Sequence, residues 1–192
     1  MPRLALASSS PYRRMLLERL GIPFEYAAPD VDETPSSGET PEQLTLRLAL
    51  DKARALTDCF TDHLIIGSDQ VLLLDGQTIS KPGNHAAAHD QLRRCSGRTV
   101  QFTTSLCLLN SRTGKHQLTS EPFKVSFREL DDESIERDLQ REQPYDCAGS
   151  FKAEGLGISL FSALQGDDPN SLIGLPLIKL CEMLRQEGLQ LP

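Results

Sequence analysis

The chain has 192 residues, and its 20 Lys and Arg against 27 Asp and Glu give a formal net charge of −7. This length suits one domain with a core large enough to fold without disulfides, so we expect a single domain over residues 1–192. The acidic balance argues against a nucleic-acid polymer as partner, because such binding depends on dense lysine and arginine surfaces. It does not exclude a small anionic ligand, which responds to the local field.

Several other classes of protein are also disfavoured. No segment approaches the roughly 20 apolar residues of a membrane helix, and the N-terminus lacks the apolar segment of a signal peptide, so we expect a cytoplasmic protein without a membrane partner. The five cysteines are scattered, with no CxxC, which argues against a disulfide framework or a zinc knuckle. His85 and His89 have the i, i+4 spacing of a helical metal site, but they lack the Glu of an HExxH motif, and a solvated helix face is the simpler interpretation.

Short strand-like and helix-like segments alternate from the N-terminus onward, which is typical of an α/β architecture. Residues 4–7 are apolar and are predicted to form a strand. Ser10 and Pro11 follow, a good N-cap and a good first helical residue, so a helix is expected directly after this strand. A second strand is predicted at residues 24–27, and an acidic loop at residues 29–35.

A capping box marks the start of the next helix, with Thr40 as the N-cap and Gln43 able to reach back to it. Residues 63–74 then form an apolar run that is broken by the polar sequence Gly-Ser-Asp-Gln at 67–70. A polar insertion in an otherwise buried strand is a local inconsistency, and such inconsistencies tend to mark functional sites.

The second half of the chain continues the alternation. Asp75 and Gly76 predict a tight hairpin turn. We expect further strands at 77–80, 99–110 and 117–127, helices at 85–94, 132–141 and 175–187, a Gly-rich loop at 146–157 and a turn at 166–170.

The segment from Ser8 to Arg14 joins the first strand to the N-terminus of the first helix. Free backbone N–H groups and the positive end of the helix dipole converge at such a junction, which makes it an anion site. The Ser8 hydroxyl and the Arg13 guanidinium add donors suited to phosphate. The alternative is an ordinary capped helix with surface arginines.

Two lysines are candidate phosphate ligands. Lys52 lies four residues after Leu48 and therefore borders the apolar face of its helix. Lys81 lies at a strand end before Pro82. Either could reach a phosphate as a point charge, and the alternative for each is an ordinary surface lysine.

Two carboxylates are candidates for the chemistry itself. Asp69 at the end of an apolar strand would be costly unless a cation, a metal or hydrogen bonds compensate its charge, although a strand-end Asp can also simply cap a turn. Glu33 shares its loop with Asp30 and Asp32, and clustered carboxylates could hold a hard divalent cation that bridges phosphates. The alternative for Glu33 is a solvated acidic loop.

The combined inventory fits metal-assisted phosphoryl chemistry on a nucleotide. It comprises two cations beside helices or strand ends, a phosphate-type helix start, two carboxylates and the glycines of 149–157, which permit close backbone approach or simply make turns. The sequence has no Walker GxxxxGK[ST] motif and no GxGxxG motif, which argues against a P-loop NTPase and a dinucleotide oxidoreductase.

A series of ordered motifs along the whole chain resembles the Maf family of nucleoside triphosphate pyrophosphatases. The motifs lie at residues 6–14, 31–33, 49–53, 66–70, 81–82, 96–97, 148–151 and 174–177. Within that family the chain is most similar to the bacterial subgroup that acts on 7-methyl-GTP. The resemblance implies an α/β fold, in which helices flank an extended mixed β-sheet and two lobes enclose a central substrate cleft.

The resemblance also implies hydrolysis of a nucleoside triphosphate between its α and β phosphates, assisted by Mg²⁺ or Mn²⁺. By this resemblance, Asp69 matches the family's general base, and Glu33 matches an acidic residue needed with the metal. Glu33 and Asp69 are therefore the expected metal ligands. The residues that match the triphosphate-holding positions are Ser8, Arg13, Lys52 and Lys81. Family members are often dimers, which leaves a homodimer open.

Three positions govern base choice in the family, and they correspond to Tyr12, Gln70 and Glu154. The members that resemble dTTP/UTP pyrophosphatases typically have Arg at the first position and Gln at the last, and this chain departs from both. Glu154 could accept hydrogen bonds from guanine and favour the positive charge of an N7-methylated ring. Tyr12 could stack on that ring with a cation–π contribution of ~0.5–2 kcal/mol, and Gln70 offers a donor and an acceptor.

Two alternatives remain open from the sequence. The chain could be a dTTP/UTP-type pyrophosphatase of the same family. It could instead be a non-catalytic nucleotide-binding regulator of cell division. Retention of Glu33, Lys52, Asp69 and Lys81 together favours catalysis, because binding an anion does not by itself require a carboxylate beside it.

Overall fold

The computed structural model describes residues 2–191, which fall into two compact units. The first unit comprises the described residues up to Gln70, the segment Thr104–Glu121 and the residues from Asp168 onward. The second unit comprises Val71–Thr103 and Pro122–Asp167. Within the described part of the chain, no helix is long and apolar enough to cross a membrane.

Seven strands form one mixed sheet, with β4 paired to β3 and the others in the order β2-β1-β3-β5-β6-β7. The pairs β1–β2 and β1–β3 are parallel, whereas β3–β4 and β6–β7 are antiparallel. The strands are β1 (Arg3–Ala7), β2 (Phe24–Ala27), β3 (His63–Leu74), β4 (Gln77–Ile79), β5 (Thr99–Asn110), β6 (His116–Phe127) and β7 (Phe161–Gln165). This mixed sheet with flanking helices confirms the predicted α/β class.

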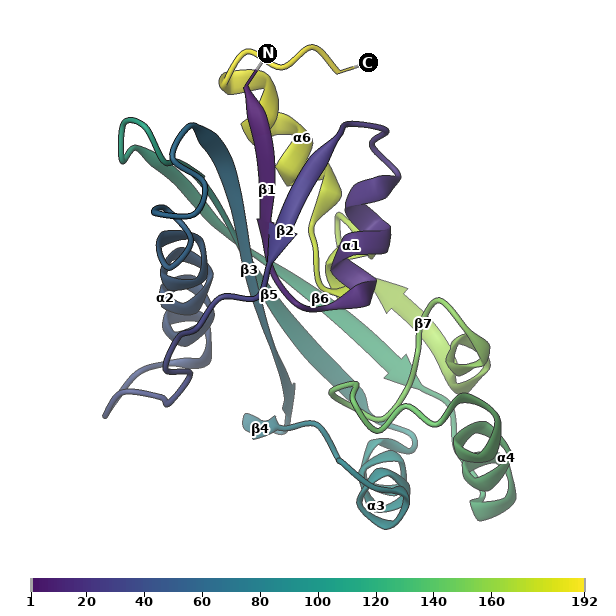
Figure 1. Ribbon diagram of the computed structural model, residues 1–192. Coiled ribbons are helices and arrows are strands. Elements are labelled where there is room, and N and C mark those ends of the chain that lie inside the picture. Colours follow the sequence, from purple (N-terminus) through teal and green to yellow (C-terminus); the bar gives the residue numbers. More distant parts are fainter. Residues whose placement is uncertain (1, 192) are drawn as a thin grey trace. The chain divides into compact units, whose positions relative to one another are not determined.

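The first unit has a hydrophobic core on each face of its part of the sheet. Successive side chains of β1 point to opposite faces, so Leu4 and Leu6 enter one core while Ala5 and Ala7 enter the other. The leucine side packs against α1 (Pro11–Glu18) and α6 (Leu177–Gln186). The alanine side packs against α2 (Pro41–Arg54), and Figure 1 shows α2 and α1 on opposite sides of β1 and β3.

The second unit is built around aromatic rings. Four phenylalanines meet edge to face, with ring centroids 4.8–5.7 Å apart: Phe102, Phe127, Phe151 and Phe161. Such arrangements are favoured by the ring quadrupoles. The helices of this unit are α3 (His85–Cys95), α4 (Asp132–Glu142) and the 3₁₀ helix η1 (Leu156–Leu160).

The predicted helix starts are confirmed in detail. Ser10 caps α1, and Thr40 and Gln43 form the complete capping box of α2. Asn84 and Asp131 cap α3 and α4 in the same way. These signals are local, so they could be read before the fold was known.

Two predictions of local structure were wrong, and one strand was not predicted. The polar sequence at 67–70 does not interrupt its strand, because β3 runs without a break from His63 to Leu74, and Asp69 lies in its middle rather than at its end. The strand β7 was not predicted, since its residues do not alternate clearly between polar and apolar. The predicted turn at 166–170 instead leads into a short helix, α5 (Pro169–Ile173), which Asp168 caps.

His85 and His89 each lie near an acidic side chain of α4. His85 Nε2 lies 2.9 Å from Glu136 Oε2 on α4, and His85 Nδ1 lies 3.0 Å from the Tyr145 hydroxyl. His89 Nε2 lies 3.9 Å from Asp132 Oδ1. These two histidines therefore join α3 to α4 rather than facing solvent alone.

Candidate functional site

A buried lysine joins two carboxylates in the first unit. Lys52 Nζ lies 2.6 Å from Asp69 Oδ1 and 2.7 Å from Glu33 Oε1. The Lys52 and Asp69 side chains are 9% and 10% exposed, whereas the Glu33 side chain is 62% exposed. The cluster therefore consists of a buried ion pair, Lys52 and Asp69, and one carboxylate, Glu33, that faces solvent. The prediction that Lys52 could be an ordinary surface lysine is excluded, and Asp69 has the compensating cation that its burial requires.

A close approach between α2 and β3 brings Lys52 to Asp69. A Cβ atom at Gly67 would lie only 2.0 Å from the Ala49 carbonyl oxygen and 3.0 Å from the Ala53 nitrogen. Only glycine allows the helix backbone this near to the strand. Lys52 lies on α2 between these contacts and Asp69 lies two residues beyond Gly67 on β3, so the glycine places the ion pair.

Arg13 lies in the first turn of α1 and is half-buried. Its Nε donates to the carbonyl oxygen of Gly174 at 2.8 Å. Gly174 is the C-cap of α5 and has a φ of 118°, a conformation that favours glycine. Burial lowers the pKa of the Arg13 guanidinium, and the carboxylates of Asp69 and Glu33 act against this shift. The same two carboxylates that contact Lys52 therefore also influence Arg13.

Ser68 and Ser8 hold the backbone around this cluster. The Ser68 hydroxyl is fully buried and lies 2.9 Å from both the Ser105 and the Gly174 carbonyl oxygens. Ser68 and Arg13 therefore share Gly174 as a partner. The Ser8 hydroxyl is also buried and accepts a hydrogen bond from the Ser10 N–H at 3.1 Å.

The protonation of Asp69 is set by opposing influences. Burial raises the pKa of Asp69, and the negative charge of Glu33 acts in the same direction. The charge and hydrogen bond of Lys52 lower it, and the charge of Arg13 does so too. Burial is the largest of these, so the net pKa is above the ordinary value of an aspartate. A carboxylate with a raised pKa is a stronger base than an exposed one.

Two of the predicted base-selecting residues belong to the first unit. Tyr12 lies beside Arg13 in α1 and is half-buried. The side-chain nitrogen of Gln70 donates to the Thr104 hydroxyl and the Ser171 carbonyl oxygen, each at 2.8 Å. Because these donors are engaged, the side-chain oxygen of Gln70 is the atom left to meet a ligand.

The other predicted site residues, Lys81 and Glu154, belong to the second unit. Both are exposed, Lys81 beyond β4 and Glu154 within the loop between Phe151 and η1. The structure thus brings together Arg13, Glu33, Lys52 and Asp69, with Ser8, Tyr12 and Gln70 in the same unit. The segment 67–70 was singled out from sequence as a candidate site, but no role was assigned to Gly67 or Ser68. Gly174 was recognised only within the motif at 174–177.

The donor set suits a metal that arrives with its substrate. Among the described residues, no three histidine, cysteine, aspartate or glutamate side chains converge in a way that could hold a metal ion. Two carboxylates, Glu33 and Asp69, converge on Lys52. Mg²⁺ is commonly bound by one or two carboxylates together with substrate phosphates and water, so this pair fits such an ion without forming a complete cage.

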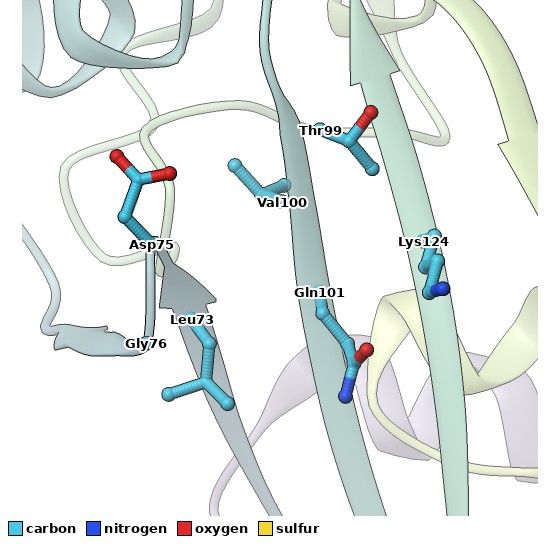
Figure 2. A pocket seen from close by; sticks show the side chains of 7 residues that line it. All are labelled: Leu73, Asp75, Gly76, Thr99, Val100, Gln101 and Lys124. Carbon is cyan, nitrogen blue, oxygen red and sulfur yellow. The ribbon is translucent and has the colours of Figure 1, made fainter.

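A shallow pocket of about 400 Å³ opens elsewhere, on the second unit. Figure 2 shows the seven residues that line it: Leu73, Asp75, Gly76, Thr99, Val100, Gln101 and Lys124. None of the predicted site residues lines this pocket.

Comparison with known proteins agrees with the motifs. A curated 7-methyl-GTP pyrophosphatase of Pseudomonas savastanoi pv. phaseolicola is 58% identical over 192 residues, which is 100% of both chains. A solved dITP/XTP pyrophosphatase of Mycobacterium abscessus is 18% identical, with 96% of this chain and 95% of that chain covered and a TM-score of 0.45. The family model described as "Maf-like protein" matches residues 3–187. This chain belongs to the Maf family.

Proposed function

We propose that this protein hydrolyses 7-methyl-GTP to 7-methyl-GMP and pyrophosphate. The observation that carries the proposal is the buried Lys52 shared by Asp69 and Glu33, in a chain 58% identical over its full length to a 7-methyl-GTP pyrophosphatase. A purely structural ion pair would not need a second, solvent-facing carboxylate on the same lysine. A single domain acting in the cytoplasm remains our prediction.

The first task of the site is to bind a polyanion. A triphosphate near neutral pH is strongly anionic and repels a nucleophile. Arg13, Lys52 and Lys81 are the proposed cations that hold it, and the start of α1 with the Ser8 hydroxyl adds donors. Positive charge held in place before the reaction also stabilises the charge that develops on the leaving pyrophosphate.

The second task is to activate water. Asp69 accepts a proton from the attacking water, whose oxygen then bonds to the α phosphorus as the bond to the bridging oxygen breaks. Asp69 must be ionised to do this, and Lys52 at 2.6 Å favours the ionised form. Because burial keeps the pKa of Asp69 above its ordinary value, activity should rise with pH as this group loses its proton.

Glu33 and Asp69 are the proposed residues that would hold Mg²⁺ or Mn²⁺. When bound with substrate, such an ion supplies charge neutralisation on the phosphate oxygens. Glu33 suits this role because its side chain is largely exposed, so an incoming ion can reach it.

Base selection is proposed for Tyr12, Gln70 and Glu154. Glu154 accepts hydrogen bonds from the guanine edge and offers a negative charge to the cationic methylated ring. Tyr12 offers a face for stacking. Gln70 contributes its side-chain oxygen, because its nitrogen already donates to Thr104 and Ser171.

A substrate panel with Asp69→Asn tests the proposal. We expect the wild-type protein to release pyrophosphate from 7-methyl-GTP in preference to GTP, dTTP and UTP, and Asp69→Asn to reduce kcat by about 10²–10⁴-fold. Nucleotide binding without pyrophosphate release by the wild type would instead favour a regulator. Preference for dTTP or UTP would favour the pyrimidine-type enzyme.

A further inference from the structure

The loop that carries Glu154 is fastened on both sides of that residue to a single residue of α4, Glu142, through its side chain on one side and its backbone carbonyl on the other. Leu156 N–H donates to Glu142 Oε1 at 3.2 Å. Lys152 Nζ donates to the Glu142 carbonyl oxygen at 2.6 Å. Glu154 lies midway between these two anchors and is itself exposed. The two contacts therefore define the span from which its carboxylate projects.

The backbone of the loop is shaped to fit Glu142. A Cβ atom at Gly155 would lie 2.6 Å from Glu142 Oε2, so a side chain at this position would displace the Glu142 carboxylate. Gly155 N–H also donates to the Lys152 carbonyl oxygen at 3.1 Å, which closes a turn around Glu154. The turn and the Glu142 side chain are thus in direct contact.

The start of the same loop is held by other groups. The Ser150 hydroxyl is fully buried and donates to Gln91 Oε1 at 2.7 Å. The Phe151 ring packs among Phe102, Phe127 and Phe161. These contacts fix the loop as far as Phe151, and Glu142 holds the part on either side of Glu154.

A negatively charged side chain at position 142 is unfavourable for the stability of α4. It is the last residue of the helix, where the unsatisfied carbonyl groups make the dipole end negative and disfavour a carboxylate. Lys152 offsets this by binding the carbonyl oxygen of that residue. The Glu142 carboxylate is disfavoured by the dipole of α4, and its hydrogen bond goes to the loop. We therefore attribute the presence of a glutamate at this position to the loop and not to the helix.

We propose that Glu142 is a positioning residue that holds the Glu154 loop and thereby sets the base selectivity of the enzyme. This inference rests on the proposed function, because Glu154 reads the base in that proposal. Glu142 itself does not touch the nucleotide. Its effect should appear in the discrimination between 7-methyl-GTP and GTP, and not in the hydrolytic step.

Three variants test this proposal. Glu142→Ala removes the acceptor for Leu156, Glu142→Gln keeps an oxygen acceptor there, and Glu133→Ala removes an exposed carboxylate from the same helix. We expect Glu142→Ala to raise KM for 7-methyl-GTP about tenfold with kcat within twofold, since a lost hydrogen bond to a charged group has about this effect. KM for GTP should change less, and both control variants should resemble the wild type.

Hydrogen exchange provides a readout that does not depend on substrate. The Leu156 amide should exchange about tenfold faster in Glu142→Ala and near the wild-type rate in Glu142→Gln. Gly155→Ala approaches the same contact from the loop and should also weaken discrimination. Unchanged Leu156 exchange, or unchanged discrimination in Glu142→Ala, would overturn the proposal. A wild type without preference for 7-methyl-GTP would overturn the proposed function, while the exchange measurement would still decide whether Glu142 holds the loop.

Discussion

Asp69 in the first unit and Asp138 in the second are both buried, and burial is the largest cause that raises the pKa of each. Asp69 has the Lys52 ammonium at 2.6 Å. Asp138 lies on the inner face of α4, and within the described part of the chain neither of its carboxyl oxygens has a hydrogen-bond partner. Its pKa is raised to about 6, by burial and by Glu142, with Lys152 acting in the opposite direction.

The difference shows two ways in which a fold accommodates a buried acid. A direct cation keeps a carboxylate ionised and available as a base, at the cost of burying a second charge. Without a cation, the least costly compensation is a proton. We therefore read Asp69 as a group maintained for chemistry, and Asp138 as a group whose charge lowers stability.

The largest expected effect comes from breaking the buried pair. Lys52→Met leaves Asp69 buried without its cation and should lower the free energy of unfolding by about 3–5 kcal/mol. Because loss of the cation raises the pKa of Asp69 further, the deficit should be largest at alkaline pH and shrink as acid protonates the carboxyl. Urea unfolding at several pH values measures this.

Lys179→Met is the matched control for this variant, because Lys179 Nζ forms a surface pair with Glu182 at 3.0 Å. Removing it should cost less than about 1 kcal/mol. Equal losses in the two variants would contradict the contrast between a buried and a surface lysine.

The next effect should come from Asp138→Asn. The folded pKa of about 6 exceeds the ordinary 3.8, so the folded state binds the proton more tightly and wild-type stability should fall as pH rises between these values. About two pKa units correspond to about 2–3 kcal/mol. The Asn variant should lose this part of the pH dependence, as followed by thermal unfolding from pH 4 to pH 8. A wild-type slope that survives the substitution would show that another group causes it.

Gly67→Ala tests how the ion pair is placed. The added Cβ would meet the Ala49 carbonyl oxygen, so α2 must move away from β3, at a cost of about 1–3 kcal/mol. Movement of α2 should also separate Lys52 from Asp69 and reduce the rate of hydrolysis. The atom that the new Cβ would meet is the backbone oxygen of Ala49, so adding Ala49→Gly should not restore stability. Recovery of stability in the Gly67→Ala, Ala49→Gly double variant would refute this explanation of the loss.

The smallest effect should come from an exposed ion pair in the second unit. Arg98 Nη1 and Asp75 Oδ2 form a salt bridge in which both side chains are more than half exposed. Arg98→Gln should change the free energy of unfolding by less than about 1 kcal/mol, and added salt should abolish even that difference. A loss as large as that of Lys52→Met would mean that burial is not what separates these pairs.

Many local features could be predicted from sequence because neighbouring residues decide them. Ser10 and Thr40 satisfy N–H groups within three residues of themselves, and both caps form as predicted. The Asp75–Gly76 turn also forms, with both residues at positive φ, as a tight two-residue hairpin requires. In each case the chemistry that fixes the structure lies inside a short window of sequence.

The arrangement of the site depends on residues far apart in the chain. Arg13 meets Gly174 across 161 positions, and Lys52 meets Asp69 across 17. The uninterrupted course of β3 through its polar segment has the same origin, since Ser68 is satisfied by Ser105 and Gly174. No local pattern announces such partners, and the strand was therefore predicted to break.

By itself, the sequence determined the α/β class, the helix starts, the hairpin turn and the membership in the Maf family, because composition, local hydrogen bonding and ordered motifs are properties of the chain alone. Only the tertiary structure decided that Lys52 is buried and shared by Asp69 and Glu33, and that Gly67 allows the helix to approach the strand. It also decided that Asp138 is buried with no hydrogen-bond partner among the described residues. Burial is the physical reason. The free energy and the pKa of a charged side chain depend on how much water and which opposite charges surround it. Tertiary packing determines both of these surroundings.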